Sequence, residues 1–216
     1  MSAWTQTQIA QTIAQKLLAI QAVSLRPQQP FVWTSGLKSP IYCDNRLTMS
    51  YPEVRDLIAD GFAAVIKEQF AECEVVAGTA TAGIPHAAWV AQKLDLPMIY
   101  VRDKAKGHGK ENLIEGHLLS GKKVVVIEDL ISTGGSSIKA AQAVRAAGAE
   151  VIGVVAIFSY QFSQAENMFA DAQLPLVTLS NYSVLLDEAL AAGVIQSSDL
   201  ESLRAWRANP AEYKAT

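Results

Sequence analysis

The sequence predicts an α/β domain in which a central, mostly parallel sheet is flanked by helices. Short apolar runs of strand length alternate with helix-length segments through the middle of the chain. Residues 123–127 (KVVVI) are apolar and β-branched after the first residue, which is typical of a strand buried on both faces. Alternating strands and helices favour a parallel sheet, because each crossover places a helix on one of its faces.

The N-terminal part of the chain differs from this pattern and predicts a small subdomain. Residues 5–20 place Ile9, Ile13 and Leu17 on one face of an amphipathic helix. Residues 31–46 (FVWTSGLKSPIYCDNR) contain two short strand-like pieces. We therefore expect one domain over residues 1–216, with the subdomain within about 1–50 and the core sheet within about 70–160.

Local signals predict where several helices begin. Ser50 and Glu53 have the spacing of a capping box and precede an apolar, helix-periodic run. A second pair with this spacing, Ser198 and Glu201, lies near the end of the chain. Pro85 fits the first turn of another helix, where a missing backbone N–H costs little.

The core elements follow from apolar runs and their stop signals. Residues 75–78, 97–101 and 150–158 are further strand candidates. Residues 136–147 predict a helix, and Gly148 marks its end.

Composition limits the class of protein and its partners. The chain has 216 residues, of which 50% are hydrophobic and 18% charged, so it can bury one sizeable core. Charges interrupt every apolar stretch before the about 20 residues needed to cross a bilayer, and residues 1–5 do not resemble a signal peptide. Cys43 and Cys73 fit a reducing compartment, and a net charge of -3 argues against nucleic acid. We expect a cytoplasmic protein without a membrane or nucleic-acid partner.

The segment after residues 123–127 carries the most informative chemistry. Two acids, Glu128 and Asp129, close the predicted strand, and Ser, Thr and Gly residues then lead into a helix. Open parallel sheets bind ligands beyond the carboxyl ends of their strands. Glycines let backbone amides approach an anion, and the start of a helix adds partial positive charge. The segment therefore predicts a phosphate site, with carboxylates suited to a magnesium-bridged sugar.

Other interpretations of this segment lack their partner motifs. A Walker B strand would need GxxxxGK[ST], and a dinucleotide fold would need GxGxxG, and the chain contains neither. A purely structural turn rarely needs two acids before a run of small polar residues. A basic cluster between Arg102 and Lys110 can attract an anion, although a solvated loop explains it equally well.

Residues 124–137 (VVVIEDLISTGGSS) resemble the signature with which type I phosphoribosyltransferases bind phosphoribosyl pyrophosphate. Three other stretches are similar to segments of the orotate phosphoribosyltransferases within that family. Residues 31–46 resemble their N-terminal hood, residues 78–83 (GTATAG) their pyrophosphate loop, and residues 102–116 (RDKAKGHGKENLIEG) their mobile catalytic loop. The matches span residues 31–136 in the family's order, which makes the resemblance specific.

This resemblance implies a type I phosphoribosyltransferase fold and a role in pyrimidine (UMP) biosynthesis. The implied reaction is the Mg²⁺-dependent transfer of phosphoribosyl from 5-phosphoribosyl 1-diphosphate to orotate. Its products are orotidine 5′-phosphate and diphosphate. The resemblance also implies a homodimer whose active sites are shared between the subunits.

The residues that the resemblance assigns fall into three sets. Lys106, His108 and Asp129 are implied to be catalytic, and Ser132, Lys38 and Tyr42 are candidates for contacts with orotate. Magnesium is implied to be held through substrate and water near Glu128 and Asp129, with no direct protein ligand. The implied phosphoribosyl diphosphate site comprises Thr81, Ala82, Arg102, Lys106, His108, Glu128, Asp129, Leu130, Ile131, Ser132, Thr133, Gly134, Gly135 and Ser136.

The chain departs from the family's pattern at several positions. Asp103 follows Arg102, where many members have a second basic residue, and Ala82 replaces a frequent lysine of the pyrophosphate loop. One bacterial branch has a hood lysine at the position of Thr34 and an arginine for the base carboxylate near Tyr160. The residue that binds the orotate carboxylate is therefore open, and Tyr160 or another residue takes this role.

Two other functions would also explain part of the sequence. A purine or uracil phosphoribosyltransferase would share the phosphate loop, but the hood sequence argues against it. A regulator that binds phosphoribosyl pyrophosphate without turnover could dispense with catalytic groups. The basic loop and the acidic net charge argue against such a regulator.

Overall fold

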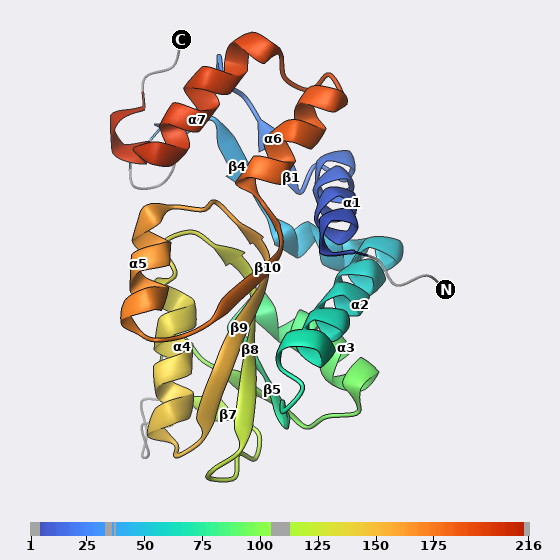
Figure 1. Cartoon of the computed structure of the whole chain (residues 1–216), viewed down its shortest axis with the longest axis vertical. Helices are drawn as coiled ribbons and strands as arrows, with labels where there is room; N and C mark the ends of the chain where they lie inside the picture. Colours follow the sequence, from blue (N-terminus) through green and yellow to red (C-terminus); the bar gives the residue numbers. More distant parts are fainter. Residues whose placement is uncertain (1–4, 33–35, 37, 105–112, 214–216) are drawn as a thin grey trace.

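The computed structural model describes residues 5–32, 36, 38–104 and 113–213 and is built around a six-stranded sheet (Figure 1). The strand order is β10-β9-β8-β5-β6-β7, and every neighbouring pair is parallel except β7, which runs antiparallel to β6. The predicted mostly parallel sheet is therefore confirmed. The strands are β5 (Val75–Thr79), β6 (Met98–Val101), β7 (Ile114–Glu115), β8 (Lys123–Ile131), β9 (Glu150–Ser159) and β10 (Leu176–Asn181).

Helices cover both faces of the sheet, because its central strands are apolar on both sides. In β8, Val125 and Ile127 pack in the cluster that contains the buried faces of the first three helices. Val124 and Val126 point the other way and pack in the cluster that contains the fourth and fifth helices. One face carries α1 (Gln6–Ala19), α2 (Pro52–Gln69) and α3 (Gly83–Leu94), and the other carries α4 (Gly135–Ala146) and α5 (Ser163–Asp171) (Figure 1).

A smaller layer, built from both ends of the chain, lies above the sheet. We call residues 23–43 the hood; its elements are β1 (Val23–Leu25), β2 (Phe31–Val32), β3 (Lys38–Ser39) and β4 (Ile41–Cys43). The antiparallel pairs are β1 with β4 and β2 with β3, and η1 (Asn45–Ser50) leads from the hood into α2.

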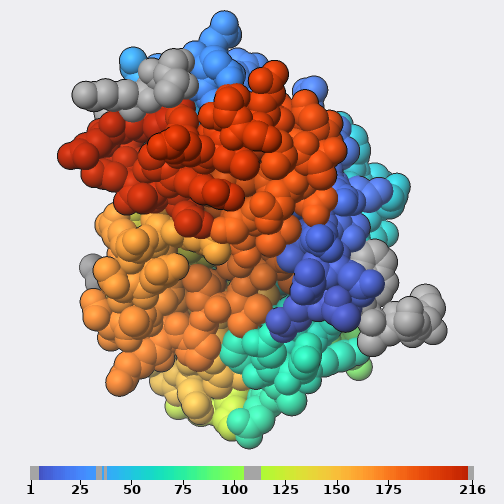
Figure 2. Space-filling model, turned by 45° about the horizontal axis from the view of Figure 1, so that its top comes forward, coloured from blue at the N-terminus to red at the C-terminus, as the bar shows by residue number. Residues whose placement is uncertain are grey.

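The C-terminal segment packs beside the hood (Figures 1 and 2). The Tyr213 hydroxyl donates a hydrogen bond to the Pro27 carbonyl at 3.0 Å, and Trp206 is only 1% exposed. The upper layer therefore includes residues far beyond the predicted range of about 1–50. Its C-terminal elements are α6 (Tyr182–Ala191), η2 (Ser197–Asp199), α7 (Leu200–Ala208) and η3 (Pro210–Glu212).

Strand β8 and the sheet as a whole both extend further along the chain than predicted. β8 continues through Glu128 and Asp129 to Ile131, so the acids lie within the strand rather than after it. The sheet also includes β10, which lies beyond the predicted end near residue 160. No helix in the described part of the chain is long and apolar enough to cross a membrane.

Both predicted capping boxes were wrong. Ser50 ends η1, and α2 begins after Tyr51 with Pro52 in its first turn. Glu53 instead forms an exposed ion pair with Lys16 of α1, which bridges the two helices. Near the C-terminus, the capping box lies earlier in the chain than the predicted pair Ser198 and Glu201, and it caps the start of η2.

The boxes that the structure contains use glutamine. Thr5 and Gln8 cap α1 reciprocally, and Gln196 and Asp199 do the same for η2. The second box has a glutamine, Gln196, at its N-cap position. Glutamine is not among the strong N-cap residues, so the sequence gave little signal for this box.

The close approach of α3 to β8 generates a prediction about Gly83, the first residue of α3. A Cβ at this position would lie 2.4 Å from the Ile127 carbonyl oxygen. We expect Gly83→Ala to lower the free energy of unfolding by about 1 to 3 kcal/mol, because neither backbone can move freely. Urea denaturation measures the loss. The matched control is Gly135→Ala at the first residue of α4, where no described atom lies within 4 Å. Equal stabilities of the two variants would contradict this account.

Candidate active site

Three segments singled out in the sequence meet at one edge of the sheet. In the parallel register, Gly78 of β5 lies opposite Ile127 of β8, and Thr79 lies opposite Val101 of β6. At this level β5 ends at Thr79 and β6 at Val101, and the Thr79 hydroxyl donates a 2.9 Å hydrogen bond to the Ile127 carbonyl. The segment with Thr81 and Ala82 and the residue Arg102 therefore follow the ends of β5 and β6, and the acidic pair lies in the part of β8 that extends past them.

Glu128 is buried and holds the start of α4. Its Oε2 accepts hydrogen bonds from the hydroxyls of Ser136 at 3.1 Å and Ser137 at 3.0 Å. The residue is only 4% exposed, and burial, with the neighbouring Asp129 charge, raises the pKa of its carboxyl to about 7. One acid of the pair is thus a structural partner of the phosphate-loop helix in this structure.

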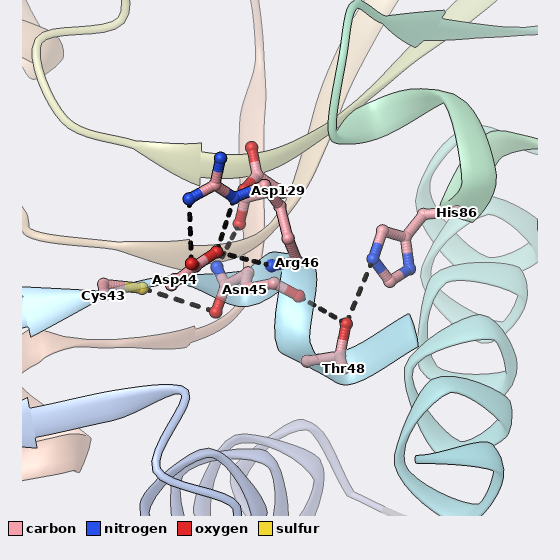
Figure 3. Close-up of polar contacts among 7 residues, drawn as sticks. All are labelled: Cys43, Asp44, Asn45, Arg46, Thr48, His86 and Asp129. Carbon is pink, nitrogen blue, oxygen red and sulfur yellow. Dashed lines mark hydrogen bonds and ion pairs between the residues drawn. The ribbon is translucent and has the colours of Figure 1, made fainter. Parts of the chain in front are cut away.

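Asp129 is the more accessible acid of the pair. Its backbone N–H donates to Glu128 Oε1 at 3.1 Å, and its carbonyl accepts a 2.7 Å hydrogen bond from Asn45 Nδ2. Burial raises the pKa of the Asp129 carboxyl, while hydrogen bonds and the positive charge of Arg46 oppose this shift. Arg46 itself binds Asp44 through Nε at 2.6 Å and Nη2 at 2.8 Å (Figure 3).

The loop between β8 and α4 has the features of an anion cradle. Gly134 has φ +85°, and a Cβ there would lie 2.9 Å from the Phe169 ring, so both backbone conformation and space favour glycine. No side chain of the described residues caps α4, which leaves the N–H groups of its first turn available to a ligand. Ser132 is half-buried and Thr133 is exposed. The remaining residues of the predicted loop set, Leu130, Ile131, Gly135 and Ser136, lie along the end of β8 and the start of α4.

The basic loop is described only at its ends. Arg102 follows β6, and its Nη1 lies 3.4 Å from Glu115 Oε1. The Asp103 carbonyl accepts a 2.6 Å hydrogen bond from Lys139 Nζ of α4, which places a further cation beside this segment. Lys106 and His108 lie outside the described residues, as does Thr34 of the hood.

The predicted base contacts of the hood are exposed. Lys38 lies in β3 and Tyr42 in β4, where the Tyr42 ring centroid is 5.6 Å from that of Phe31. Both side chains can be reached by a ligand.

Tyr160 cannot supply a positive charge to the site. It is 3% exposed and packs edge-on against Trp206, and burial raises its pKa well above the usual value. A cation comes instead from α7: Arg207 Nη1 donates to Gln161 Oε1 at 3.2 Å and to Ser183 Oγ at 2.7 Å. The chain thus places a cation beside the residue that follows Tyr160.

Arg207 also lines a cavity of about 360 Å³ next to the phosphate loop. Ser132 and Thr133 line the same cavity, which can therefore accept a small anionic group. Sequence reasoning missed Arg207, because no motif surrounds it and its neighbourhood is created only when α7 docks. It also missed the polar network around Asn45, Thr48 and His86 (Figure 3).

Comparison with known proteins places this geometry in a family. A family model described as "Phosphoribosyl transferase domain" matches residues 50–175. The chain is 58% identical over 207 residues to the orotate phosphoribosyltransferase of Enterococcus faecalis, covering 96% of this chain and 99% of that protein. The chain belongs to the orotate phosphoribosyltransferase family.

Further relatives agree in sequence and in fold. The chain is 61% identical to the orotate phosphoribosyltransferase of Staphylococcus saprophyticus, over 93% of this chain and 99% of that one. The crystal structure of orotate phosphoribosyltransferase from Aeropyrum pernix superposes with a TM-score of 0.73 at 31% identity, covering 82% of this chain and 97% of that one. The family and the type I fold predicted from the motifs are confirmed.

Proposed function

We propose that the protein transfers phosphoribosyl from 5-phosphoribosyl 1-diphosphate to orotate, giving orotidine 5′-phosphate and diphosphate for pyrimidine biosynthesis. The observation that carries this proposal is the acidic pair at the end of β8, followed by the uncapped start of α4. This arrangement suits a ribose 5-phosphate, with the sugar beside Asp129 and the phosphate on the amides of the loop. The two free cysteines support the further proposal that the enzyme works in the cytoplasm.

The acidic pair is the proposed partner of the ribose. Asp129 meets the ribose hydroxyls and stabilises positive charge that develops on the sugar as diphosphate leaves. Glu128 is proposed to contact the ribose as well, for which its carboxylate would exchange the hydroxyl of Ser136 for one of the sugar. The reactants are held in line, so that the base nitrogen attacks C1′ from the face opposite the leaving group.

Magnesium fits this site only together with the substrate. Carboxylate oxygens are suitable ligands, but the described residues contain no cluster of three or more metal-binding side chains. We propose that the ion is held near Glu128 and Asp129 through water, ribose and diphosphate oxygens. When bound, it neutralises charge on the diphosphate.

The base is proposed to lie between the phosphate loop and the hood. Ser132, Lys38 and Tyr42 are the proposed orotate contacts. The carboxylate of orotate additionally needs a cation, and Arg207 is an oriented cation in the cavity that Ser132 lines. We therefore propose Arg207 as its partner in place of Tyr160.

The diphosphate end is proposed to be covered by the basic loop of the other subunit. Arg102, Lys106 and His108 bind the diphosphate, and Lys106 or His108 donates a proton as it leaves. Thr81 and Ala82 contribute backbone amides from the adjoining loop. In this arrangement each homodimer has two active sites, and each site draws residues from both chains.

The role of Asp129 is tested by Asp129→Asn, which keeps its size but removes its charge. We expect kcat to fall about a hundredfold or more, as for the loss of one preorganised electrostatic group. The assay follows loss of orotate absorbance with phosphoribosyl diphosphate and magnesium. Asp171→Asn at the exposed end of α5 is the control and should be unchanged. A large loss of thermal stability with near-normal turnover would instead make Asp129 structural.

The role of Arg207 is tested by base discrimination. Uracil lacks the carboxylate of orotate, so Arg207→Gln should raise KM for orotate about tenfold or more while changing turnover of uracil little. KM for phosphoribosyl diphosphate should stay within about twofold, and Arg204→Gln, an exposed arginine on the same helix, is the control. Equal losses for both bases would remove Arg207 from carboxylate recognition.

The shared-site proposal is tested by subunit exchange. Lys106→Ala and Asp129→Asn are each expected to be nearly inactive as homodimers. After equal mixing, half of the dimers carry both variants, and each of these has one intact site if Lys106 acts across the interface. Activity should then recover to about a quarter of the wild-type value. A tagged pull-down confirms exchange, and confirmed exchange without recovered activity would place Lys106 in its own chain's site.

A further inference from the structure

A buried chain of hydrogen bonds links the hood, the acidic strand and α3 (Figure 3). Asn45 Nδ2 donates to the Asp129 carbonyl at 2.7 Å, and Thr48 Oγ1 lies 2.6 Å from the Asn45 carbonyl. Thr48 Oγ1 also lies 3.3 Å from His86 Nε2. Asn45, Thr48 and His86 are each 1% exposed or less.

The chemistry of these groups fixes the direction of the chain. The Thr48 hydroxyl has one proton, and a carbonyl can only accept, so this proton goes to Asn45. The contact with His86 therefore requires that Nε2 carries a proton and donates to the hydroxyl. Nδ1 is then the unprotonated nitrogen, and it has no hydrogen-bond partner among the described residues. Burial lowers the pKa of His86 to about 4, which agrees with a neutral ring.

The amide of Asn45 is oriented as well. Its Nδ2 faces a carbonyl, and its Oδ1 lies 3.4 Å from the Cys43 thiol, which can donate only weakly. The opposite orientation would place two acceptors against each other at 2.7 Å. Asn45 thus connects the last strand of the hood to the backbone of Asp129.

The network joins segments whose mutual placement decides the site. His86 lies in the first turns of α3, which follows Thr81 and Ala82, and Asn45 directly follows the hood. Asp129 lies in β8 between them. No residue of the network other than Asp129 is proposed to touch substrate.

We propose that Asn45 is a positioning residue, which holds the Asp129 backbone so that its carboxylate meets the ribose. His86 acts on Asn45 through Thr48. The position of the Asp129 carboxylate therefore depends on how the hood and α3 pack against β8. This inference rests on the proposed function. Removing the Asn45 amide leaves the Asp129 carbonyl without its donor, and misplacement of a reacting group by about 1 Å can cost about a hundredfold in rate.

The experiment compares pairs of variants that remove or keep each hydrogen bond. Asn45→Ala should lower kcat about tenfold or more, while KM for phosphoribosyl diphosphate and for orotate each stay within about threefold. Thr48→Val and His86→Leu should lower kcat in the same direction. Thr48→Ser keeps the hydroxyl and His86→Gln keeps an N–H donor, so both should recover most of the loss.

A matched control separates positioning from general loss of stability. Ser39 is a fully buried hood residue whose hydroxyl donates to the Ile41 carbonyl at 2.7 Å, with no bond to β8. Ser39→Ala should lower the melting temperature to a similar extent as Thr48→Val but leave kcat unchanged. All rates are measured well below the melting temperature of each variant.

Two further measurements make the result decisive. The double variant Asn45→Ala/His86→Leu should be no slower than Asn45→Ala alone, because both act through the same bond. The inference is overturned if Thr48→Ser is as slow as Thr48→Val, or if Asn45→Ala lowers only the melting temperature. Wild-type enzyme is assayed alongside: failure to consume orotate would refute the proposed function, whereas normal wild-type turnover with an unaffected Asn45→Ala refutes this inference alone.

Discussion

The structure depends on the register of three parallel strands. Because β5 pairs residue by residue with β6 on one side and with β8 on the other, the segments after β5 and β6 reach the edge of the sheet beside the acidic pair of β8. Apolar residues anchor β8 on both faces, and Val124 to Ile127 are all 0% exposed. A slip of one residue would turn every side chain of the strand to the opposite face and would move the acids away from the phosphate loop. The core packing therefore determines the geometry of the site.

This arrangement places the carboxyl group of Glu128 where it has little contact with water. Glu128 loses water on folding, and its hydrogen bonds to Ser136 and Ser137 offset part of that loss. The same bonds fix the first turn of α4, so the acid and the phosphate loop are positioned together. Asp129 keeps more contact with solvent and is held mainly through its backbone. Adjacent residues of the same type thus have different physical environments.

Much of the core could be predicted from the sequence because its signals are local. The β-branched run before Glu128 and the glycines after Asp129 predict a strand, a turn and a candidate anion site without knowledge of distant contacts. Helix starts were harder, since Glu53 was expected to cap its own helix but instead pairs with Lys16 across the packed interface. The end of β8 was also missed, because pairing with β9 extends the strand past the point where the apolar pattern stops.

The parts of the site that could not be predicted are those that depend on tertiary contacts. Arg207, the proposed partner of the orotate carboxylate, lines a cavity with Ser132 and Thr133 only because α7 returns to the top of the sheet. His86 is buried, and its bond to Thr48 gives no sequence signal. Asn45, directly after the hood, gave no signal either, because the sequence does not distinguish a polar residue that faces solvent from one that faces the backbone of a strand.

The construction of the upper layer from both chain ends has a consequence for biosynthesis on the ribosome. The strand with the acidic pair and the loop after it are synthesised before α7, so the nascent chain contains Glu128 and Asp129 before the upper layer is complete. Tyr160 and Phe162 then lack the indole of Trp206 against which they later pack, and they expose aromatic surface that the finished protein hides. The cavity that Arg207 lines is therefore completed late, after α7 has been synthesised, and the exposed aromatic side chains favour aggregation until then.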